Sequence, residues 1–101
     1  MENVTADVVK KLQAEGKKVL VDYYATWCGP CKVLIPKLEE IEKSYPNITF
    51  VKVNVDENMD HAKEMNIRGV PTVLIYQGDN LKDRSSGVQS DNHYKNVLDS
   101  L

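Results

Sequence analysis

The chain has 101 residues, of which 42% are hydrophobic, so it fits one compact domain with one core and has no room for a second catalytic domain. Its formal charge is -2 at pH 7, with acids and bases scattered rather than gathered in blocks. This pattern predicts binding to neither nucleic acid nor an anionic membrane. No apolar stretch approaches the roughly 20 residues that span a bilayer. The N-terminus lacks the pattern of a secretory signal, so we expect a soluble, cytoplasmic protein.

The first half of the chain alternates helical and strand patterns. Thr5 is a candidate cap for a first helix that ends at Gly16, and a strand over 19–25 follows. The next helix begins at the two cysteines and ends near Pro46. Pro36 lies inside it, where one backbone hydrogen bond is lost and a bend is expected. The inward face of this helix is continuous and consists of Leu34, Leu38, Ile41 and Tyr45.

The second half completes one α/β domain over residues 1–101. A strand over 48–55 follows the cysteine helix, and this order predicts a βαβ unit with a right-handed crossover and parallel strands. A short helix over 58–66 comes next. The strands 73–76 and 81–86 then form a hairpin, and Ser90 caps a last helix. We therefore predict a central mixed sheet with helices on both faces.

The two cysteines are the only ones in the chain, and they lie two residues apart at a strand-to-helix junction. The free N–H groups and the dipole at the start of the helix favour the thiolate of Cys28, the form that attacks disulfides. Disulfide exchange needs one attacking thiolate and a second thiol that releases the mixed disulfide. We therefore predict that Cys28 is an exposed nucleophile and that Cys31 is the resolving cysteine.

A carboxyl group and an amine accompany this pair in strands that read as buried. Asp22 is the only acid in the apolar run before the cysteines, and burial should raise its pKa until it can accept a proton near neutral pH. Lys52 lies in the next strand and should extend toward Asp22 and moderate that pKa. The alternatives are a solvent-facing Asp22 and a surface Lys52.

Taken together, these features resemble the thioredoxin family over nearly the whole chain. The segments and residues that carry the resemblance are WCGPCK at 27–32, Asp22, Pro36, Lys52, IRGVPT at 67–72 and Gly87. A lone CxxC is a weak signal, whereas this order and spacing are specific. Two departures are present: Tyr24 stands where the family often has tryptophan, and the short N-terminus truncates or removes the first strand. The sheet is therefore expected to have four or five strands.

The resemblance implies a thioredoxin fold and a general protein disulfide reductase. Such a protein is a monomer without metal or cofactor, recharged by a thioredoxin reductase that draws on NADPH or ferredoxin. It also implies that Asp22 accepts the proton of Cys31, that Lys52 modulates Asp22, and that Gly29 and Pro30 tune the redox potential. The residues expected to bind protein substrates, around a cis proline, are Trp27, Gly69, Val70, Pro71 and Gly87.

Three other readings of the sequence stay open. A zinc module would need two ligands besides the cysteines, and only His61 and His93 are available, which we expect to be solvated helix residues. A non-catalytic subunit could dock through the surface around Trp27. A periplasmic oxidase or cytochrome-maturation relative would share the same chemistry and differ in redox potential.

Overall fold

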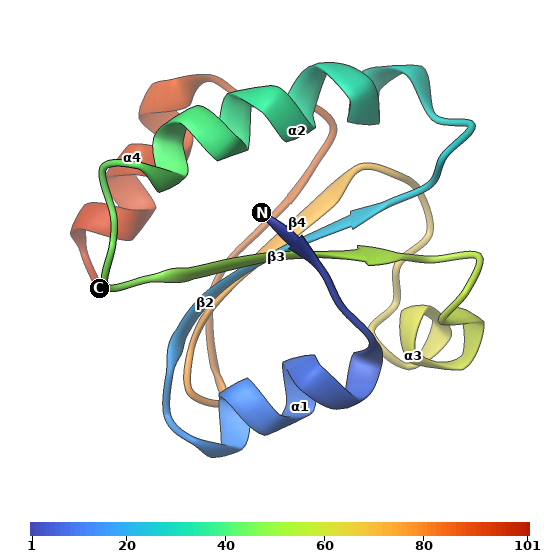
Figure 1. Ribbon diagram of the computed structural model, residues 1–101, viewed down its shortest axis with the longest axis horizontal. Helices are drawn as coiled ribbons and strands as arrows, with labels where there is room; N and C mark the ends of the chain where they lie inside the picture. Colours follow the sequence, from blue (N-terminus) through green and yellow to red (C-terminus); the bar gives the residue numbers. More distant parts are fainter.

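The order of the elements follows from the alternation of apolar patterns along the chain, and Figure 1 shows how they are arranged. A computed structural model describes all residues, 1–101. The elements are β1 (Glu2–Asn3), α1 (Ala6–Ala14), β2 (Lys18–Tyr24), α2 (Gly29–Glu42), β3 (Thr49–Asn54), α3 (Met59–Glu64), β4 (Thr72–Gln77), β5 (Asn80–Ser86) and α4 (Asp91–Asp99). None of the helices combines the length and the apolar character needed to cross a membrane.

The sheet has five strands in the order β1-β3-β2-β4-β5, which places β2 at its centre. β2 pairs in parallel with β3 and antiparallel with β4, so the predicted mixed sheet is confirmed. β1 consists of Glu2 and Asn3, which pair in parallel with Val51 and Lys52 of β3. The four-stranded alternative is therefore wrong. The first strand is short but present, because even two residues can pair with the otherwise free edge of β3.

The two faces of the sheet carry separate cores. Figure 1 shows α2 and α4 on one face and α1 and α3 on the other. Leu20 of β2 packs with Leu34 and Leu38 of α2 in one core, whereas Val21 packs with Val9 of α1 in the other. Because successive side chains of a strand point to opposite faces, a central strand covered on both sides reads as one unbroken apolar run. The β2 segment has this pattern, which is why the sequence predicts a strand there.

The cysteine helix is shorter than predicted. α2 runs through Pro36 but ends at Glu42, before Tyr45 and Pro46. The residue that precedes a proline is disfavoured in helical backbone, so the helix has to end ahead of Tyr45. The side chain of Tyr45 nevertheless packs against the core on this face, as a partly buried residue.

The capping predictions have different outcomes at the two ends of the chain. Ser90 Oγ accepts a hydrogen bond from the His93 backbone N–H at 3.2 Å, so the predicted cap of α4 is confirmed. Thr5 occupies the N-cap position of α1, but its side chain makes no capping hydrogen bond. The Ala6 N–H instead donates to Asn58 Oδ1 at 3.1 Å. α1 is thus capped from a distant part of the chain, which local sequence does not reveal.

The predicted β4–β5 hairpin is confirmed, with antiparallel pairing from Thr72–Ser86 to Gln77–Asn80. Gly78 turns the chain with a φ of +60°, a left-handed conformation that favours glycine. Its N–H donates to the Lys17 carbonyl at 2.8 Å, which attaches the turn to the link between α1 and β2. The hairpin is therefore fixed beside the central strand.

Candidate active site

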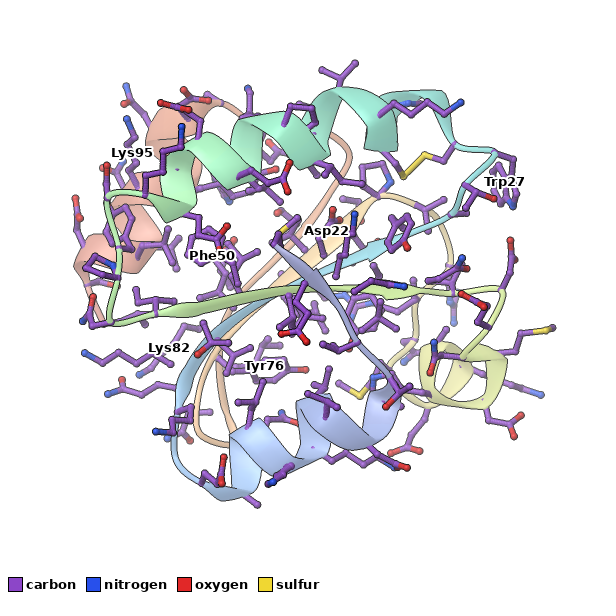
Figure 2. The ribbon with its side chains drawn as sticks, in the orientation of Figure 1. Asp22, Trp27, Phe50, Tyr76, Lys82 and Lys95 are labelled. Atoms are coloured by element: carbon purple, nitrogen blue, oxygen red, sulfur yellow. A yellow bond between two sulfur atoms is a disulfide. The ribbon has the colours of Figure 1, made fainter.

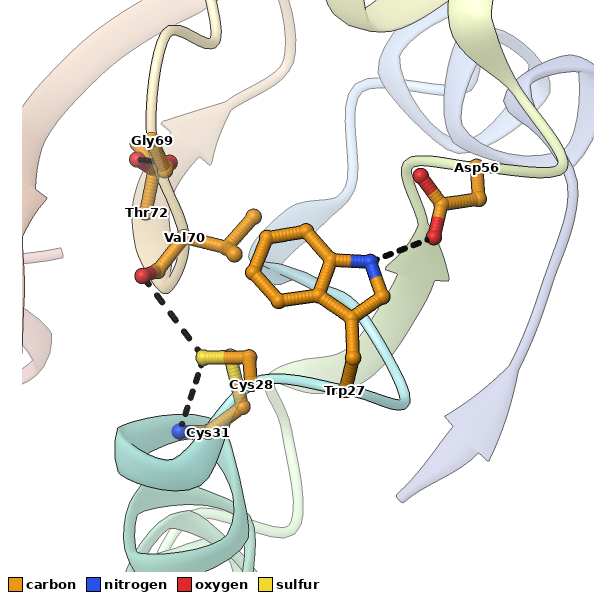
Figure 3. Close-up of a disulfide and its surroundings, with 7 residues drawn as sticks. All are labelled: Trp27, Cys28, Cys31, Asp56, Gly69, Val70 and Thr72. Carbon is orange, nitrogen blue, oxygen red and sulfur yellow. Dashed lines mark hydrogen bonds between the residues drawn. A yellow bond between two sulfur atoms is a disulfide. The ribbon is translucent and has the colours of Figure 1, made fainter.

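The two cysteines lie where β2 ends and α2 begins, and they form a disulfide (Figure 3). Cys28 is the N-cap residue of α2, and its Sγ accepts a hydrogen bond from the Cys31 N–H at 3.2 Å. Gly29 and Pro30 form the exposed first turn of the helix and bring no charge between the cysteines. The predicted junction is therefore confirmed, with Cys28 Sγ at the positive end of the helix dipole.

The prediction that Cys28 is exposed is wrong for this disulfide form. Cys28 has an exposed fraction of 4%, and Cys31 one of 1%. Both cysteines cluster with Tyr24 and Ala25, and Val70 packs against this cluster from a loop distant in sequence. The cover over Cys28 is thus formed by tertiary packing, which the local sequence around the cysteines does not show.

The loop before β4 borders the disulfide. The Val70–Pro71 peptide bond is cis, as the family resemblance implied. The Val70 carbonyl oxygen lies 3.6 Å from Cys28 Sγ (Figure 3). The Gly87 N–H donates to the Pro71 carbonyl at 2.9 Å, which places the end of β5 beside this loop. Three predicted substrate residues, Val70, Pro71 and Gly87, therefore lie together, and Val70 is the one beside Cys28.

Trp27 forms the other side of the site. Its side chain points away from the core, with an exposed fraction of 69%, and its Nε1–H donates to Asp56 Oδ2 at 2.8 Å (Figure 3). A hollow of about 130 Å³ beside the indole is lined by Trp27, Val55, Ile67, Arg68, Gly69 and Val70. Trp27 is therefore a surface residue, and its indole is exposed to solvent beside this hollow.

Asp22 lies between the sheet and α2 (Figure 2). It is fully buried, and neither carboxyl oxygen has a hydrogen-bond partner. Burial raises the pKa of Asp22 to about 7, and the positive charge of Lys52 opposes part of that rise. Lys52 is opposite Asp22 in the β2–β3 register and is half-buried. The predicted buried acid with a raised pKa is therefore confirmed, and the solvent-facing alternative is wrong.

The comparisons with known proteins agree with this geometry. The thioredoxin family model matches residues 2–100. The chain belongs to the thioredoxin family. Thioredoxin from Mycoplasmoides gallisepticum is 42% identical over 88 residues, which cover 87% of this chain and 88% of that protein. The X-ray structure of Fasciola hepatica thioredoxin superposes with a TM-score of 0.87 at 32% identity and covers 98% of each chain. Oxidised mitochondrial thioredoxin 3 from Saccharomyces cerevisiae gives 0.87 at 33% identity, covering 98% of this chain and 94% of that one.

Membership of this family identifies the chemistry of the site. Thioredoxins are protein-disulfide oxidoreductases, and Cys28 and Cys31 are the dithiol pair of this one. The family acts on disulfide substrates and is reduced by thioredoxin reductase. The protein therefore carries out dithiol–disulfide exchange through Cys28 and Cys31.

The two histidines are less exposed to solvent than predicted. His61 has an exposed fraction of 5%, and its Nε2 lies 2.9 Å from the Tyr23 hydroxyl. Burial lowers the pKa of His61. His93 is half-buried, with Nε2 2.8 Å from Asp83 Oδ2. No group of three or more His, Cys, Asp or Glu side chains is arranged to hold a metal ion.

The sequence reasoning did not include Asp56 in the site, although a signal for it was present. Asp56 follows directly after β3, and β2 and β3 are parallel. The carboxyl ends of parallel neighbours meet at one edge of the sheet, so the residues after β3 lie beside the residues after β2. This topology brings Asp56 to Trp27, and the predicted βαβ unit alone could have suggested the contact.

Proposed function

We propose that the chain is a general protein disulfide reductase, acting as a single-domain monomer in the cytoplasm and recharged by a thioredoxin reductase. One observation carries this proposal: the Cys28–Cys31 disulfide lies at a helix N-terminus, and a backbone carbonyl, that of Val70, is 3.6 Å from Cys28 Sγ. A helix N-terminus stabilises a thiolate, and a neighbouring free carbonyl can pair with the backbone of an extended substrate. The site thus combines a nucleophile with a means of aligning its target.

The exchange proceeds in two displacements at sulfur. The Cys28 thiolate of the reduced protein attacks one sulfur of a substrate disulfide, and the other substrate sulfur leaves as a thiolate. Cys31, after losing its proton, then attacks Cys28 Sγ and releases the second substrate thiolate. Two electrons pass to the substrate, and the Cys28–Cys31 disulfide results. The reductase returns two electrons and two protons to this pair.

Asp22 is proposed as the acceptor of the Cys31 proton. A base is most effective when its pKa lies near the working pH, and the pKa of Asp22 is about 7. Cys31 and Asp22 are both buried, with exposed fractions of 1% and 0%, so solvent has little access to either group. Lys52 is proposed to keep the pKa of Asp22 from rising further.

The substrate surface is proposed to extend from Trp27 over the hollow to Gly69, Val70, Pro71 and Gly87. Trp27 supplies an exposed aromatic face, and the hollow beside it offers room for an apolar side chain that flanks the substrate cysteine. The Val70 backbone would pair with the substrate as an added strand. This low, apolar surface suits many protein disulfides rather than one shaped ligand.

The redox potential should be that of a reductant. Gly29 and Pro30 place no cation between the cysteines that would stabilise a reduced thiolate. Thioredoxins have potentials of about -270 mV, and we adopt this general value as the expectation. Equilibration with dithiothreitol and glutathione measures it. A value near the about -180 mV of disulfide isomerases would instead support oxidation or isomerisation.

Cysteine variants test the proposed roles in the reduction of insulin disulfides. Cys28→Ser should reduce insulin no faster than a reaction without the protein. Cys31→Ser should accumulate a mixed disulfide with the substrate on Cys28, which mass spectrometry detects. Full biological activity of the Cys28→Ser, Cys31→Ser double variant, despite its lack of insulin reduction, would overturn the catalytic proposal and favour a docking subunit.

The role of Asp22 is tested on the resolving step alone. In a mixed disulfide of Cys28 with thionitrobenzoate, release of the coloured thiol reports only the attack by Cys31. The rate should rise with pH through the pKa of Asp22 near 7. Asp22→Asn should lose this rise and slow release about 100-fold at pH 7. Asp79→Asn, in the exposed hairpin turn, is the matched control, and identical profiles from pH 6 to 9 would remove Asp22 from the mechanism.

A further inference from the structure

Three polar residues of different strands form one row across the sheet. The β1–β3 register places Asn3 opposite Lys52, and the β2–β3 register places Lys52 opposite Asp22. Residues directly opposite each other on paired strands point to the same face. The Lys52 side chain therefore emerges between that of Asn3 on the short edge strand and that of Asp22 on the central strand.

Tyr24 joins the ends of this row. It lies two residues after Asp22 on β2, so its side chain is on the same face. Its hydroxyl donates to Asn3 Oδ1 at 3.0 Å, and Lys52 Nζ lies 5.3 Å from the centre of its ring. Tyr24 is 9% exposed and packs in the cluster that contains both cysteines. Its ring thus extends from β2 past Lys52 to β1.

The Lys52 ammonium makes a cation–π contact with the Tyr24 ring. No carboxylate lies within ion-pair distance of Lys52 Nζ. A lysine side chain has about 2 kcal/mol of rotamer entropy that favours its spread through solvent. A cation over an aromatic ring gains about 0.5 to 2 kcal/mol, depending on desolvation. The two terms are of similar size, so loss of the Tyr24 ring should shift the ammonium toward solvent.

The other ionisable groups around Asp22 are few. Lys52 acts on it from β3, and Tyr24 from its own strand. Tyr94 acts from α4, and the cysteines at the start of α2 form a disulfide and do not titrate. Among these, Lys52 is the only cation, so its location sets the electrostatic attraction felt by the Asp22 carboxylate.

We propose that Tyr24 is a positioning residue for disulfide exchange: its hydroxyl, anchored on Asn3, and its ring hold the Lys52 ammonium beside Asp22. This inference rests on the proposed function in one respect, which is that Asp22 takes part in disulfide exchange. Asn3, from a strand of two residues, becomes part of the support of the active site.

The direct test is the titration midpoint of the Asp22 carboxyl in the oxidised protein, followed by ¹³C NMR. Tyr24→Leu should raise this midpoint by about half a pH unit, because an opposite charge that moves away no longer favours the carboxylate. Lys52→Met should raise it further. If Tyr24 merely packed over Asp22, its removal would admit water and lower the midpoint, and that result would overturn the proposal.

A double-mutant cycle isolates the path through Lys52. With Lys52→Met already present, Tyr24→Leu should cause no further rise, because no ammonium remains to be positioned. An equal rise in both backgrounds would show that Tyr24 acts on Asp22 by another route and would contradict the proposal.

Milder variants keep the test valid if Tyr24→Leu does not fold. Tyr24→Phe and Asn3→Ala each remove the hydroxyl anchor and should raise the midpoint in the same direction by a smaller amount, with no additional rise when combined. Tyr23→Phe is the matched control, because it removes one hydroxyl hydrogen bond from the same strand but on the opposite face, and it should leave the midpoint unchanged. A midpoint unmoved by both anchor variants and by Tyr24→Leu would refute the role of Tyr24.

The midpoint separates this inference from the proposed function. It is read in the oxidised protein and needs no turnover, so it reports on Tyr24 even if Asp22→Asn leaves thionitrobenzoate release unchanged. If both proposals hold, the pH profile of that release in Tyr24→Leu should shift upward by the same amount as the midpoint. A shifted midpoint with an unshifted profile would contradict Asp22 as the base while leaving the positioning intact.

Discussion

Two neighbouring residues of β2, one on each face of the sheet, differ in whether their buried polar groups have a partner. Tyr23 points to the α1 face, where its hydroxyl lies 2.9 Å from His61 Nε2. Asp22 points to the α2 face, where both its oxygens are buried without a partner. A buried group in a hydrogen bond supports folding, whereas one without a partner opposes it. The Tyr23 hydroxyl therefore supports the fold, whereas Asp22 is retained at the expense of stability.

The largest predicted effect is the decrease in unfolding free energy with rising pH that Asp22 causes. The pKa of Asp22 is about 7 in the folded protein and near 3.8 when unfolded, so between these values the folded state holds a proton that the unfolded state has released. Stability therefore falls as pH rises through this window, by about 4 kcal/mol in total from this group. Asp22→Asn should lack this decrease. Urea unfolding of both proteins from pH 4 to pH 8 measures the difference.

One outcome of this experiment would contradict the comparison of the two faces. If the difference in unfolding free energy between wild type and Asp22→Asn stays constant over that pH range, the carboxyl is not held in a destabilising state. Asp79→Asn in the exposed turn provides the baseline and should give a constant difference.

A smaller effect is expected on the α1 face. Tyr23→Phe leaves His61 Nε2 without its partner in a buried position and should lower the unfolding free energy by about 1 to 2 kcal/mol. Tyr76→Phe is the matched control, because Tyr76 packs in the same core and its hydroxyl makes no hydrogen bond within the protein. Urea unfolding at pH 7 compares the two. Equal losses would mean that the hydrogen bond between Tyr23 and His61 adds nothing to stability.

The smallest effect should be at Ser85, on the Asp22 face. The β4 register connects Asp22 to Val73, and Val73 to Ser85. The buried Ser85 Oγ makes no hydrogen bond of standard geometry and has only a weak contact with the Tyr94 hydroxyl. Ser85→Ala should change the unfolding free energy by less than about 0.5 kcal/mol, because no hydrogen bond is lost. Ser86→Ala, the exposed neighbour, is the reference. A loss as large as that of Tyr23→Phe would remove the contrast between the faces.

Most of the fold could be predicted because its elements have strong periodic patterns. β2 and β3 are apolar runs on either side of a helix, and that order determines their parallel pairing. β1 could not be predicted in the same way, since two residues contain no period and their pairing depends on the free edge of β3. The end of α2 was placed too late because the apolar pattern continues to Tyr45 after the helix has stopped.

In the site, chemistry that follows from residue type was predictable, and contacts between distant segments were not. The buried state of Asp22 followed from one acid in an apolar strand. The cover over Cys28 and the hydrogen bond of Trp27 depend on loops at Val70 and Asp56. The burial of His61 could have been predicted, because His61 is four residues before Met65 and so lies on the same face of the helix. Its polar side chain suggested solvent, but the Tyr23 hydroxyl on the facing strand gives it a buried partner.

The strand order also has a consequence for hydrogen exchange. β2 is paired on both sides, so its amide protons should exchange only when most of the sheet opens, whereas β1 has two pairs at one edge and opens locally. Asp22 thus lies in a strand that should exchange slowly, while Asn3, the acceptor for Tyr24, lies in a two-residue edge strand that should exchange fast. The Tyr24 hydroxyl should therefore lose and regain its anchor on Asn3 more often than β2 itself opens.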